Sequence, residues 1–328
     1  MTDTHERTVS TTTGEVPVTG LGPTLMHEHL FVFDAELERN WVRRWDRAEQ
    51  VDLAVRKLDR AYDHGIRTVV DLTVIGLGRD VELVREVGER TRVQLVVATG
   101  VYTFNELPRY VTQRGPGSMN GGPDVLGALL KRDIEEGIAG TDVRASVLKV
   151  ATDEPGVTPG VERMLRTTAQ VHRETGVPIM THANASLRQG LAQLDIFESE
   201  GVDLSRVVIG HCGDSRDLDY HRELLDRGAY VGLDRFGLVH LLPDEDRAEV
   251  VAELCRQGYA DRLVLSHDSS TYSHSFEPAT RERLGDWDYS HISRVVLPAL
   301  AVAGVAQEQI DQMLVRNPMA VLGHDGPY

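Results

Sequence analysis

The sequence predicts a (β/α)8 barrel, a single domain in which eight parallel strands alternate with eight helices. Short apolar runs rich in β-branched residues alternate eight times with segments of helical periodicity. The runs are apolar at successive positions, which is typical of strands buried on both faces. Several helical segments end at a glycine just before the next run, as at Gly65, Gly176 and Gly228. Eight such units in about 300 residues fit a closed barrel better than an open doubly wound sheet.

The elements follow one another regularly along the chain. The predicted strands are 23–31, 67–73, 94–102, 145–152, 178–185, 206–213, 230–237 and 262–269. The predicted helices are 47–64, 79–91, 125–137, 161–175, 188–200, 216–227, 244–257 and 290–303. Residues 8–19 are typical of two short strands around Gly14, a hairpin at the bottom of the barrel, and 302–322 of a last helix. The predicted division is a hairpin within 1–22, a barrel at 23–304, and a C-terminal helix and tail at 305–328.

Composition excludes several classes of protein. The 328 residues carry a formal charge of −16, which disfavours nucleic acids and anionic membranes as partners. Apolar residues make up 41% and charged residues 26%, as in an ordinary globular protein. The two cysteines, Cys212 and Cys255, fit a reducing compartment, and neither a secretory signal nor a membrane-spanning run is evident. We therefore expect a soluble cytoplasmic protein. The first strand is followed by no Gly-x-Gly-x-x-Gly motif, which disfavours dinucleotide binding.

Candidate metal ligands gather where the predicted strands end, which is where active sites of these barrels lie. Because strand side chains alternate, His27 and His29 point to one side of the first strand and Glu28 to the other. Alone, a histidine there is more often a hydrogen-bonded group than a ligand, and an aspartate can simply cap a helix. The coincidence on five strands indicates one shared centre. The other members are Lys149 in an apolar run, His182, His211 and Asp268.

The remaining histidines are given no role in this centre. His267 alternates with Asp268 and should face away from the barrel axis. The others lie in predicted helices or loops: His64, His172, His221, His240, His274, His291 and His324.

This arrangement resembles the binuclear metal pattern of the phosphotriesterase family within the amidohydrolase superfamily. The resemblance runs from Pro23 to about Leu322 and rests on His27-x-His29, Lys149, His182, His211 and Asp268 in that order. It implies two divalent metals bridged by a hydroxide and by an N6-carboxylated Lys149. His27, His29 and Asp268 would hold the buried metal, and His182 and His211 the exposed one. These ligands suit zinc above all, with cobalt, manganese or iron as alternatives.

Two further residues resemble those of the phosphotriesterase-like lactonases, in particular the actinobacterial ones. Tyr102 ends the third strand and Arg235 the seventh, and the connection at 238–243 is short, as in that branch. The alternative is a ring packed at the barrel rim and an arginine paired with an acid. The segment after Asp268, 269–272, departs from many relatives and bears on substrate preference.

The long connection at 269–289 must overhang the centre. Its aromatic residues are expected to line a channel for an acyl chain, and the alternative is a loop packed on neighbouring helices. These residues are Tyr272, Phe276, Trp287 and Tyr289.

The expected function is that of a metal-dependent lactonase acting on N-acyl-homoserine lactones or related γ- and δ-lactones, with weak phosphotriesterase activity. Asp268 would transfer protons, Tyr102 would donate a hydrogen bond near the lactone ring, and Arg235 would help to hold the loops. A dedicated organophosphate triesterase and a metal-loaded barrel without turnover are the alternatives. A mononuclear deaminase is disfavoured by Lys149. The resemblance also implies a homodimer.

Overall fold

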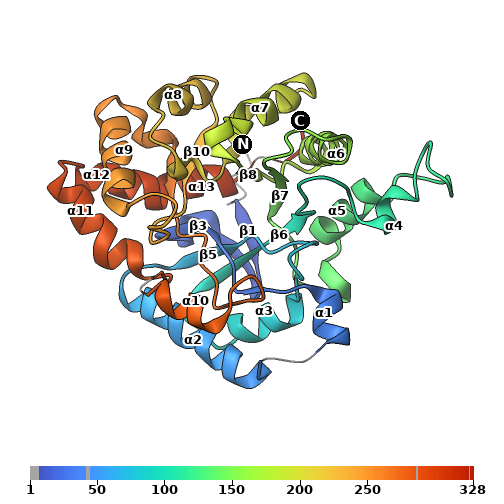
Figure 1. Ribbon diagram of the computed structural model, residues 1–328, viewed down its shortest axis with the longest axis horizontal. Coiled ribbons are helices and arrows are strands. Elements are labelled where there is room, and N and C mark those ends of the chain that lie inside the picture. The colour runs from blue at the N-terminus through green and yellow to red at the C-terminus, as the bar shows by residue number, and fades with distance from the viewer. Residues whose placement is uncertain (1–6, 42–44, 286, 325) are drawn as a thin grey trace, which may run out of the picture.

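Eight parallel strands form the barrel within the residues that the structure describes, 7–41, 45–285, 287–324 and 326–328 (Figure 1). The structure is a computed structural model. Each strand lies beside the next one along the chain, so the predicted (β/α)8 fold is confirmed. The strands are β3 (Thr24–Glu28), β5 (Thr68–Asp71), β6 (Gln94–Gly100), β7 (Val147–Thr152), β8 (Ile179–Ala183), β9 (Val207–Ile209), β10 (Tyr230–Leu233) and β11 (Leu263–Leu265).

Helices surround the barrel, and several of the long ones begin at an aspartate or threonine whose side chain accepts a hydrogen bond from the first helical turn. The main ones are α2 (Arg47–Asp63), α3 (Val81–Gly88), α5 (Val125–Glu135), α6 (Pro159–Thr175), α7 (Gln189–Ser199), α8 (Leu218–Asp226), α9 (Asp244–Arg256) and α11 (Leu297–Val302). The other helices are α1 (Ala35–Asn40), α4 (Arg109–Thr112), α10 (Pro278–Arg283), α12 (Gln307–Asp311) and α13 (Asn317–Leu322).

Some predicted boundaries were wrong. The predicted strands 206–213 and 262–269 end early, because His211 (φ 63°) and Asp268 (φ 53°) adopt a left-handed backbone that a strand does not contain. The predicted last helix begins at Gln307, after a turn at Gly304, and a π-helical segment joins α12 to α13. The loop 269–289 contains α10 and a short strand, β12 (Tyr272–Ser273), which pairs with β4 (Phe31–Val32).

Two apolar clusters explain why the strands are apolar at successive positions. One cluster fills the barrel interior with side chains such as Met26, Val96 and Met180. The other packs between the strands and the helices, with residues such as Leu25, Leu95 and Ile179. Neighbouring residues of one strand therefore enter different clusters, and both faces of the sheet are buried.

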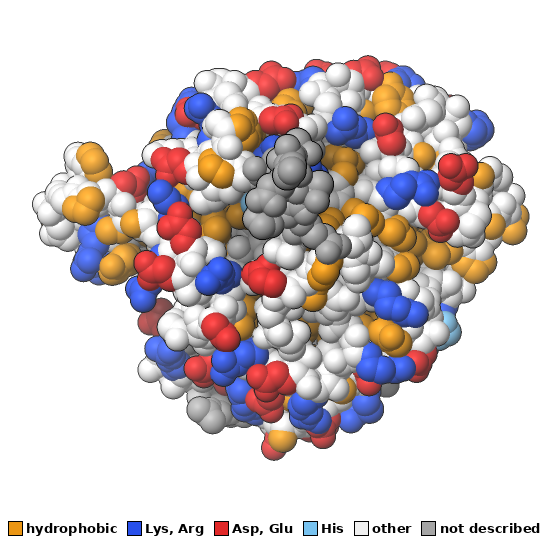
Figure 2. Space-filling view, turned by 180° about the vertical axis from the view of Figure 1, so that it is seen from behind, with side chains coloured by type: hydrophobic (Ala, Val, Ile, Leu, Met, Phe, Trp, Pro, Cys, Tyr) orange, Lys and Arg blue, Asp and Glu red, His pale blue; other side chains and the backbone are white. Residues whose placement is uncertain are grey.

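The predicted hairpin is also present. It consists of β1 (Thr8–Thr11) and β2 (Gly14–Pro17), which pair antiparallel. The N–H of Thr12 donates to the carbonyl of Leu95 at the start of β6, so the hairpin lies at the end of the barrel opposite to the strand C-termini. The segment around α4 projects from the body (Figure 1), and basic and acidic side chains are interspersed on the face seen in Figure 2. Among the described residues, no helix combines the length and the apolar character needed to span a membrane.

The barrel closes where its first and last strands meet, just beyond the C-terminal end of β11. The N–H of Asp268 donates to the carbonyl of His27 (3.0 Å), and the N–H of His29 donates to the carbonyl of Ser269 (2.8 Å). We call this contact between β3 and residues 266–269 the seam.

Glu28 holds the seam from the outer side of the barrel, opposite to its two histidine neighbours. Its fully buried carboxylate accepts hydrogen bonds from the Ser266 hydroxyl (2.8 Å), from the N–H of His267 (2.9 Å) and from the N–H of Ser269 (2.8 Å). The His267 ring nitrogen Nδ1 lies 2.6 Å from the same carboxylate. As predicted, His267 therefore faces away from the barrel axis.

Replacing Glu28 tests how strongly the seam depends on this carboxylate. Glu28→Gln turns one acceptor oxygen into an N–H₂ group that faces N–H donors, and we expect a loss of about 3 kcal/mol in the free energy of unfolding. The measurement is urea unfolding at equal metal content. Glu135→Gln, an exposed residue, is the control and should change stability by less than about 0.5 kcal/mol. Equal small changes in both variants would show that the barrel closes without Glu28.

Candidate metal centre

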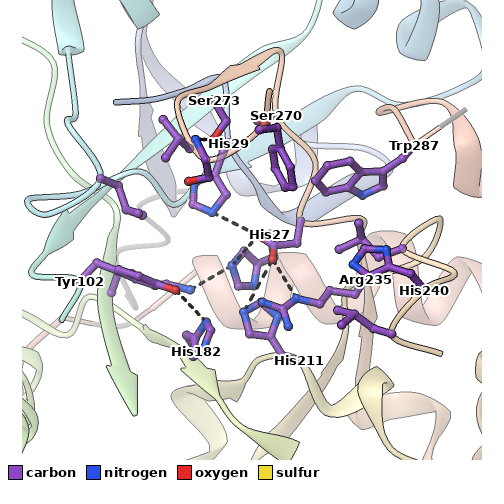
Figure 3. Close-up of a pocket in the computed structure, with 18 residues that line it drawn as sticks. His27, His29, Tyr102, His182, His211, Arg235, His240, Ser270, Ser273 and Trp287 are labelled. Atoms are coloured by element: carbon purple, nitrogen blue, oxygen red, sulfur yellow. Dashed lines mark hydrogen bonds and ion pairs between the residues drawn. The ribbon is translucent and has the colours of Figure 1, made fainter. Parts of the chain in front are cut away.

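All predicted site residues line one pocket at the C-terminal ends of the barrel strands (Figure 3). The cavity is about 270 Å³. His27 lies in β3, Lys149 in β7 and His182 in β8, whereas His211 and Asp268 lie in the segments that follow β9 and β11. The predicted set that the pocket unites is His27, His29, Tyr102, Lys149, His182, His211, Arg235 and Asp268.

Imidazole nitrogens and one carboxylate converge at the base of this pocket. Asp268 Oδ1 lies 3.2 Å from His29 Nε2 and 3.7 Å from His27 Nε2. Asp268 Oδ2 lies 3.8 Å from His211 Nε2. The rings of His182 and His211 are 4.4 Å apart between centroids. The donors of the two predicted metal positions are thus neighbours in space.

Each histidine is held at its outer nitrogen, which leaves the inner nitrogen facing the pocket. Asp234 binds Nδ1 of both His27 (2.6 Å) and His211 (2.9 Å). The hydroxyl of Thr73 contacts His29 Nδ1 at 2.9 Å. Outer partners of this kind fix the tautomer and the orientation of metal-binding histidines.

His182 uses its two nitrogens the other way round. Its Nε2 lies 2.5 Å from Asp153, and its Nδ1 faces the pocket, 3.3 Å from the Tyr102 hydroxyl. The inner nitrogen is therefore Nδ1 in His182 and Nε2 in His27, His29 and His211.

Burial keeps these imidazoles neutral, which is the form that binds metals. Burial and the nearby Lys149 lower the pKa of His27 to about 4, although Asp234 acts in the opposite direction. Burial and Arg235 hold the pKa of His211 well below its usual range. Burial alone would raise the pKa of the Asp268 carboxyl, but His211 and Arg235 bring it well below its usual range.

Lys149 is a buried amine among imidazoles. Its side chain is almost fully buried, and its Nζ lies 2.9 Å from His27 Nε2. Burial lowers the pKa of Lys149 to about 7, although Asp268 and Asp234 act in the opposite direction. Much of the amine is therefore unprotonated near neutral pH, as reaction with CO₂ requires. A carbamate would add an anion between the two groups of donors, so the residues fit two divalent cations.

Two glycines let the neighbouring strands approach this centre closely. A Cβ on Gly100 would collide with the carbonyl oxygen of Lys149 in the adjacent strand. A Cβ on Gly210 would collide with the carbonyl oxygen of Thr181 and lie 3.0 Å from Asp234 Oδ2. Both positions accept only glycine while the strands stay in place.

The outer partners Asp234, Asp153 and Thr73 were not predicted from the sequence. Each follows a strand end near a predicted ligand, and that position was the available signal. Asp234 also groups with His27 and His211 as a possible ligand set. We assign it an orienting role, because its oxygens already face the outer nitrogens of both rings and the N–H of His211 (2.8 Å).

Arg235 is paired with acids, which was the alternative to its expected role. Its Nε donates to Asp268 Oδ2 (2.9 Å) and its Nη1 donates to Asp214 (2.7 Å). Asp214 also accepts from the buried Arg247 of α9 (2.8 Å). Arg235 thereby ties the carboxylate in the pocket to the outer helices.

The pocket wall differs in part from the expectation. His240, which was expected to have no role in the centre, lines the pocket, as do Leu238 and Leu241 of the connection after β10. Phe276 and Trp287 line it as expected. Tyr272 and Tyr289 were expected there and are not among the lining residues, because their loop folds back and Tyr289 is buried against the carbonyl of His29 (2.6 Å).

Comparisons with known proteins agree with this geometry. The model of the phosphotriesterase family matches residues 7–322. A phosphotriesterase homology protein of Mycobacterium tuberculosis is 47% identical over 322 residues, which cover 98% of this chain and 99% of that protein. An aryldialkylphosphatase of Saccharolobus solfataricus is 38% identical over 304 residues, covering 91% and 94%. The solved structure of the phosphotriesterase from Mycobacterium tuberculosis has a TM-score of 0.96 at 46% identity and covers 98% of this chain and 100% of that chain.

Lys149→Ala tests whether the lysine completes the centre. The variant should lose bound metal, because it removes the donor that the resemblance implies at this position, and short carboxylic acids should partly restore metal binding. Metal content per chain is the measurement. Lys131→Ala is the control, since Lys131 pairs with Glu174 on the surface (2.9 Å). Retention of two metals by Lys149→Ala would contradict the assignment.

Asp234→Asn tests the orienting role of the missed aspartate. An amide cannot accept from both rings as a carboxylate does, so we expect metal affinity to fall about 10- to 100-fold. Competition with a chelator measures the affinity. In the control Asp226→Asn, the changed carboxylate accepts from the Tyr259 hydroxyl on the surface (2.7 Å), and affinity should be unchanged. If both variants bind metal equally well, Asp234 does not orient the ligands.

Proposed function

This chain belongs to the phosphotriesterase family, and we propose that within that family of hydrolases it is a metal-dependent lactonase. The proposed substrates are N-acyl-homoserine lactones or related γ- and δ-lactones, with phosphotriesters hydrolysed weakly. Zinc is the proposed metal, a homodimer the proposed assembly and the cytoplasm the proposed location.

The observation that carries this proposal is a phenol hydroxyl in a pocket with an apolar wall. Burial and the charge of Asp268 raise the pKa of Tyr102 well above its usual range, so the hydroxyl stays a hydrogen-bond donor. Apolar side chains of two loops, Leu238, Leu241, Phe276 and Trp287, line the same pocket. The polar edge of a flat lactone ring matches the Tyr102 hydroxyl, and an acyl chain matches the apolar wall.

The residues of the pocket have distinct tasks in the proposed reaction. Divalent metals bound here would polarise the lactone carbonyl and activate a water molecule. Tyr102 donates a hydrogen bond to the ring. Asp268 faces the ligand nitrogens and Arg235, so it is placed to take a proton from the attacking water and pass it to the leaving alkoxide. Arg235 orients that carboxylate.

A dedicated organophosphate triesterase is the second candidate, and the aryldialkylphosphatase among the relatives favours it. The short connection after β10 argues for the lactone, because residues 238–243 are too few to wrap around a tetrahedral phosphorus with three bulky esters. A metal-loaded barrel that binds ligand without turnover is the third candidate.

A panel of lactones and paraoxon on one metal-replete preparation decides between these functions. We expect kcat/KM for the best lactone to exceed that for paraoxon by at least ~100-fold, about 2.7 kcal/mol. Tyr102→Phe should narrow the difference by lowering the lactone value more than the phosphotriester value, whereas Tyr110→Phe, at an exposed ring, should leave it unchanged.

Other outcomes favour the rival functions. Equal or higher efficiency on paraoxon would assign the triesterase activity. Two bound metals with no hydrolysis of any ester would assign a binding protein.

A further inference from the structure

A second pocket lies behind the loop that walls the metal pocket, between α2 and α10, which Figure 1 shows beside each other. This α2–α10 pocket measures about 510 Å³, and its polar lining includes Gln50, Lys57, Thr271, Arg281 and Asp288. We propose that it binds a small oxoanion, a carboxylate or a phosphate, between Lys57 and Arg281.

Arg281 has one hydrogen-bonding group without an acceptor. Its Nη2 donates to the carbonyls of Ser270 (2.6 Å) and Trp287 (3.2 Å), and its guanidinium lies 4.6 Å from the centre of the Trp287 ring. Its Nη1 is buried, and no acceptor for it occurs in the described part of the chain. A buried charged donor without a partner leaves part of the guanidinium charge uncompensated, and the charge of an anion in the adjoining cavity would offset it.

Lys57 brings a second positive charge to the same pocket. Burial and the neighbouring Arg281 lower the pKa of Lys57 to about 8. Asp288 acts in the opposite direction, but its carboxylate is already engaged by Ser290 (2.7 Å) and by Arg60 (3.3 Å). Three cations therefore surround one carboxylate among the described residues.

This local excess of positive charge stands out in a chain with a net charge of −16. Two like charges that share a half-buried pocket repel each other, and a monoanion between them would replace the repulsion with two attractions. Carboxylates and phosphates also match the planar geometry of a guanidinium.

The α2–α10 pocket shares a wall with the metal pocket. Ser273, Phe276 and Trp287 line both. The two carbonyls to which Arg281 donates belong to Ser270 and Trp287, which also line the metal pocket. An anion on Arg281 would therefore steady the loop that shapes the substrate pocket.

The scarcity of lysine gives a direct test, since the chain contains only Lys57, Lys131 and Lys149. Holoprotein labelled with ¹³C at lysine Cε should show three side-chain signals, assigned with Lys57→Arg and Lys131→Arg. Titration with sodium phosphate, and separately with sodium acetate, should shift the Lys57 signal saturably with a Kd in the millimolar range or tighter. The apparent pKa of Lys57 should rise at the same time. Saturation by one anion alone would narrow the ligand to that class.

Variants of α10 localise the binding. Arg281→Gln should weaken the response of Lys57 at least ~10-fold, because one of the two positive charges that attract the anion is lost. Arg283→Gln is the matched control, because Arg283 lies on the same helix, is exposed, and donates to Thr280 (3.0 Å). It should leave the Kd unchanged.

The signals of the other two lysines separate the alternatives. A Lys57 signal that does not move, or that moves only in parallel with Lys131 or equally in sodium chloride of the same ionic strength, would overturn the proposal. A response of Lys149 alone would place the anion in the metal pocket and would also overturn it. None of these readouts depends on turnover, so the outcome is independent of the proposed lactonase activity.

Discussion

The carboxylate of Glu28 is the contact on which the metal pocket depends, because it joins the first strand of the barrel to the segment after the last one. That carboxylate binds Ser266, His267 and Ser269 on the outer side of the seam. On the inner side, His27 and Asp268 share a backbone hydrogen bond. The contacts that close the barrel therefore also bring together His27 and Asp268, candidate ligands that are far apart in the sequence. The site therefore requires the buried carboxylate of Glu28, although its side chain points away from the pocket that His27 and His29 face.

A second layer of contacts gives the ligands their orientation. Asp234 binds both His27 of β3 and His211, which follows β9, and the two rings stack with their centroids 4.7 Å apart. A displacement of Asp234 would therefore change the orientation of both imidazole rings. Arg235 and Asp214 connect the carboxylate of Asp268 to Arg247 of α9. The histidines and Asp268 are thus held in place by residues that lie behind them and outside the pocket centre.

The site residues were predictable where polar side chains interrupt an apolar strand. His27-x-His29 follows the period of a strand, and Lys149 places a charge within an apolar run, so both are visible in the sequence. Asp234 and Asp153 were missed because an acid after a strand also looks like the cap of the next helix. The early ends of the strands before His211 and Asp268 depend on backbone angles that non-glycine residues rarely adopt. The pairing of β12 with β4 joins segments far apart in the chain and too short to show periodicity.

Gly100 and Gly210 constrain how this protein can change in evolution. At either position a side chain would displace the backbone of the neighbouring strand, which carries Lys149 in one case and the residue before His182 in the other. The barrel wall between the ligands is therefore closed to variation. New substrate preferences can arise from loop side chains that line the pocket, such as Leu238, Leu241 and Phe276. Substitutions that change substrate preference should therefore accumulate in the two loops that carry these side chains, while the residues of the barrel wall stay the same.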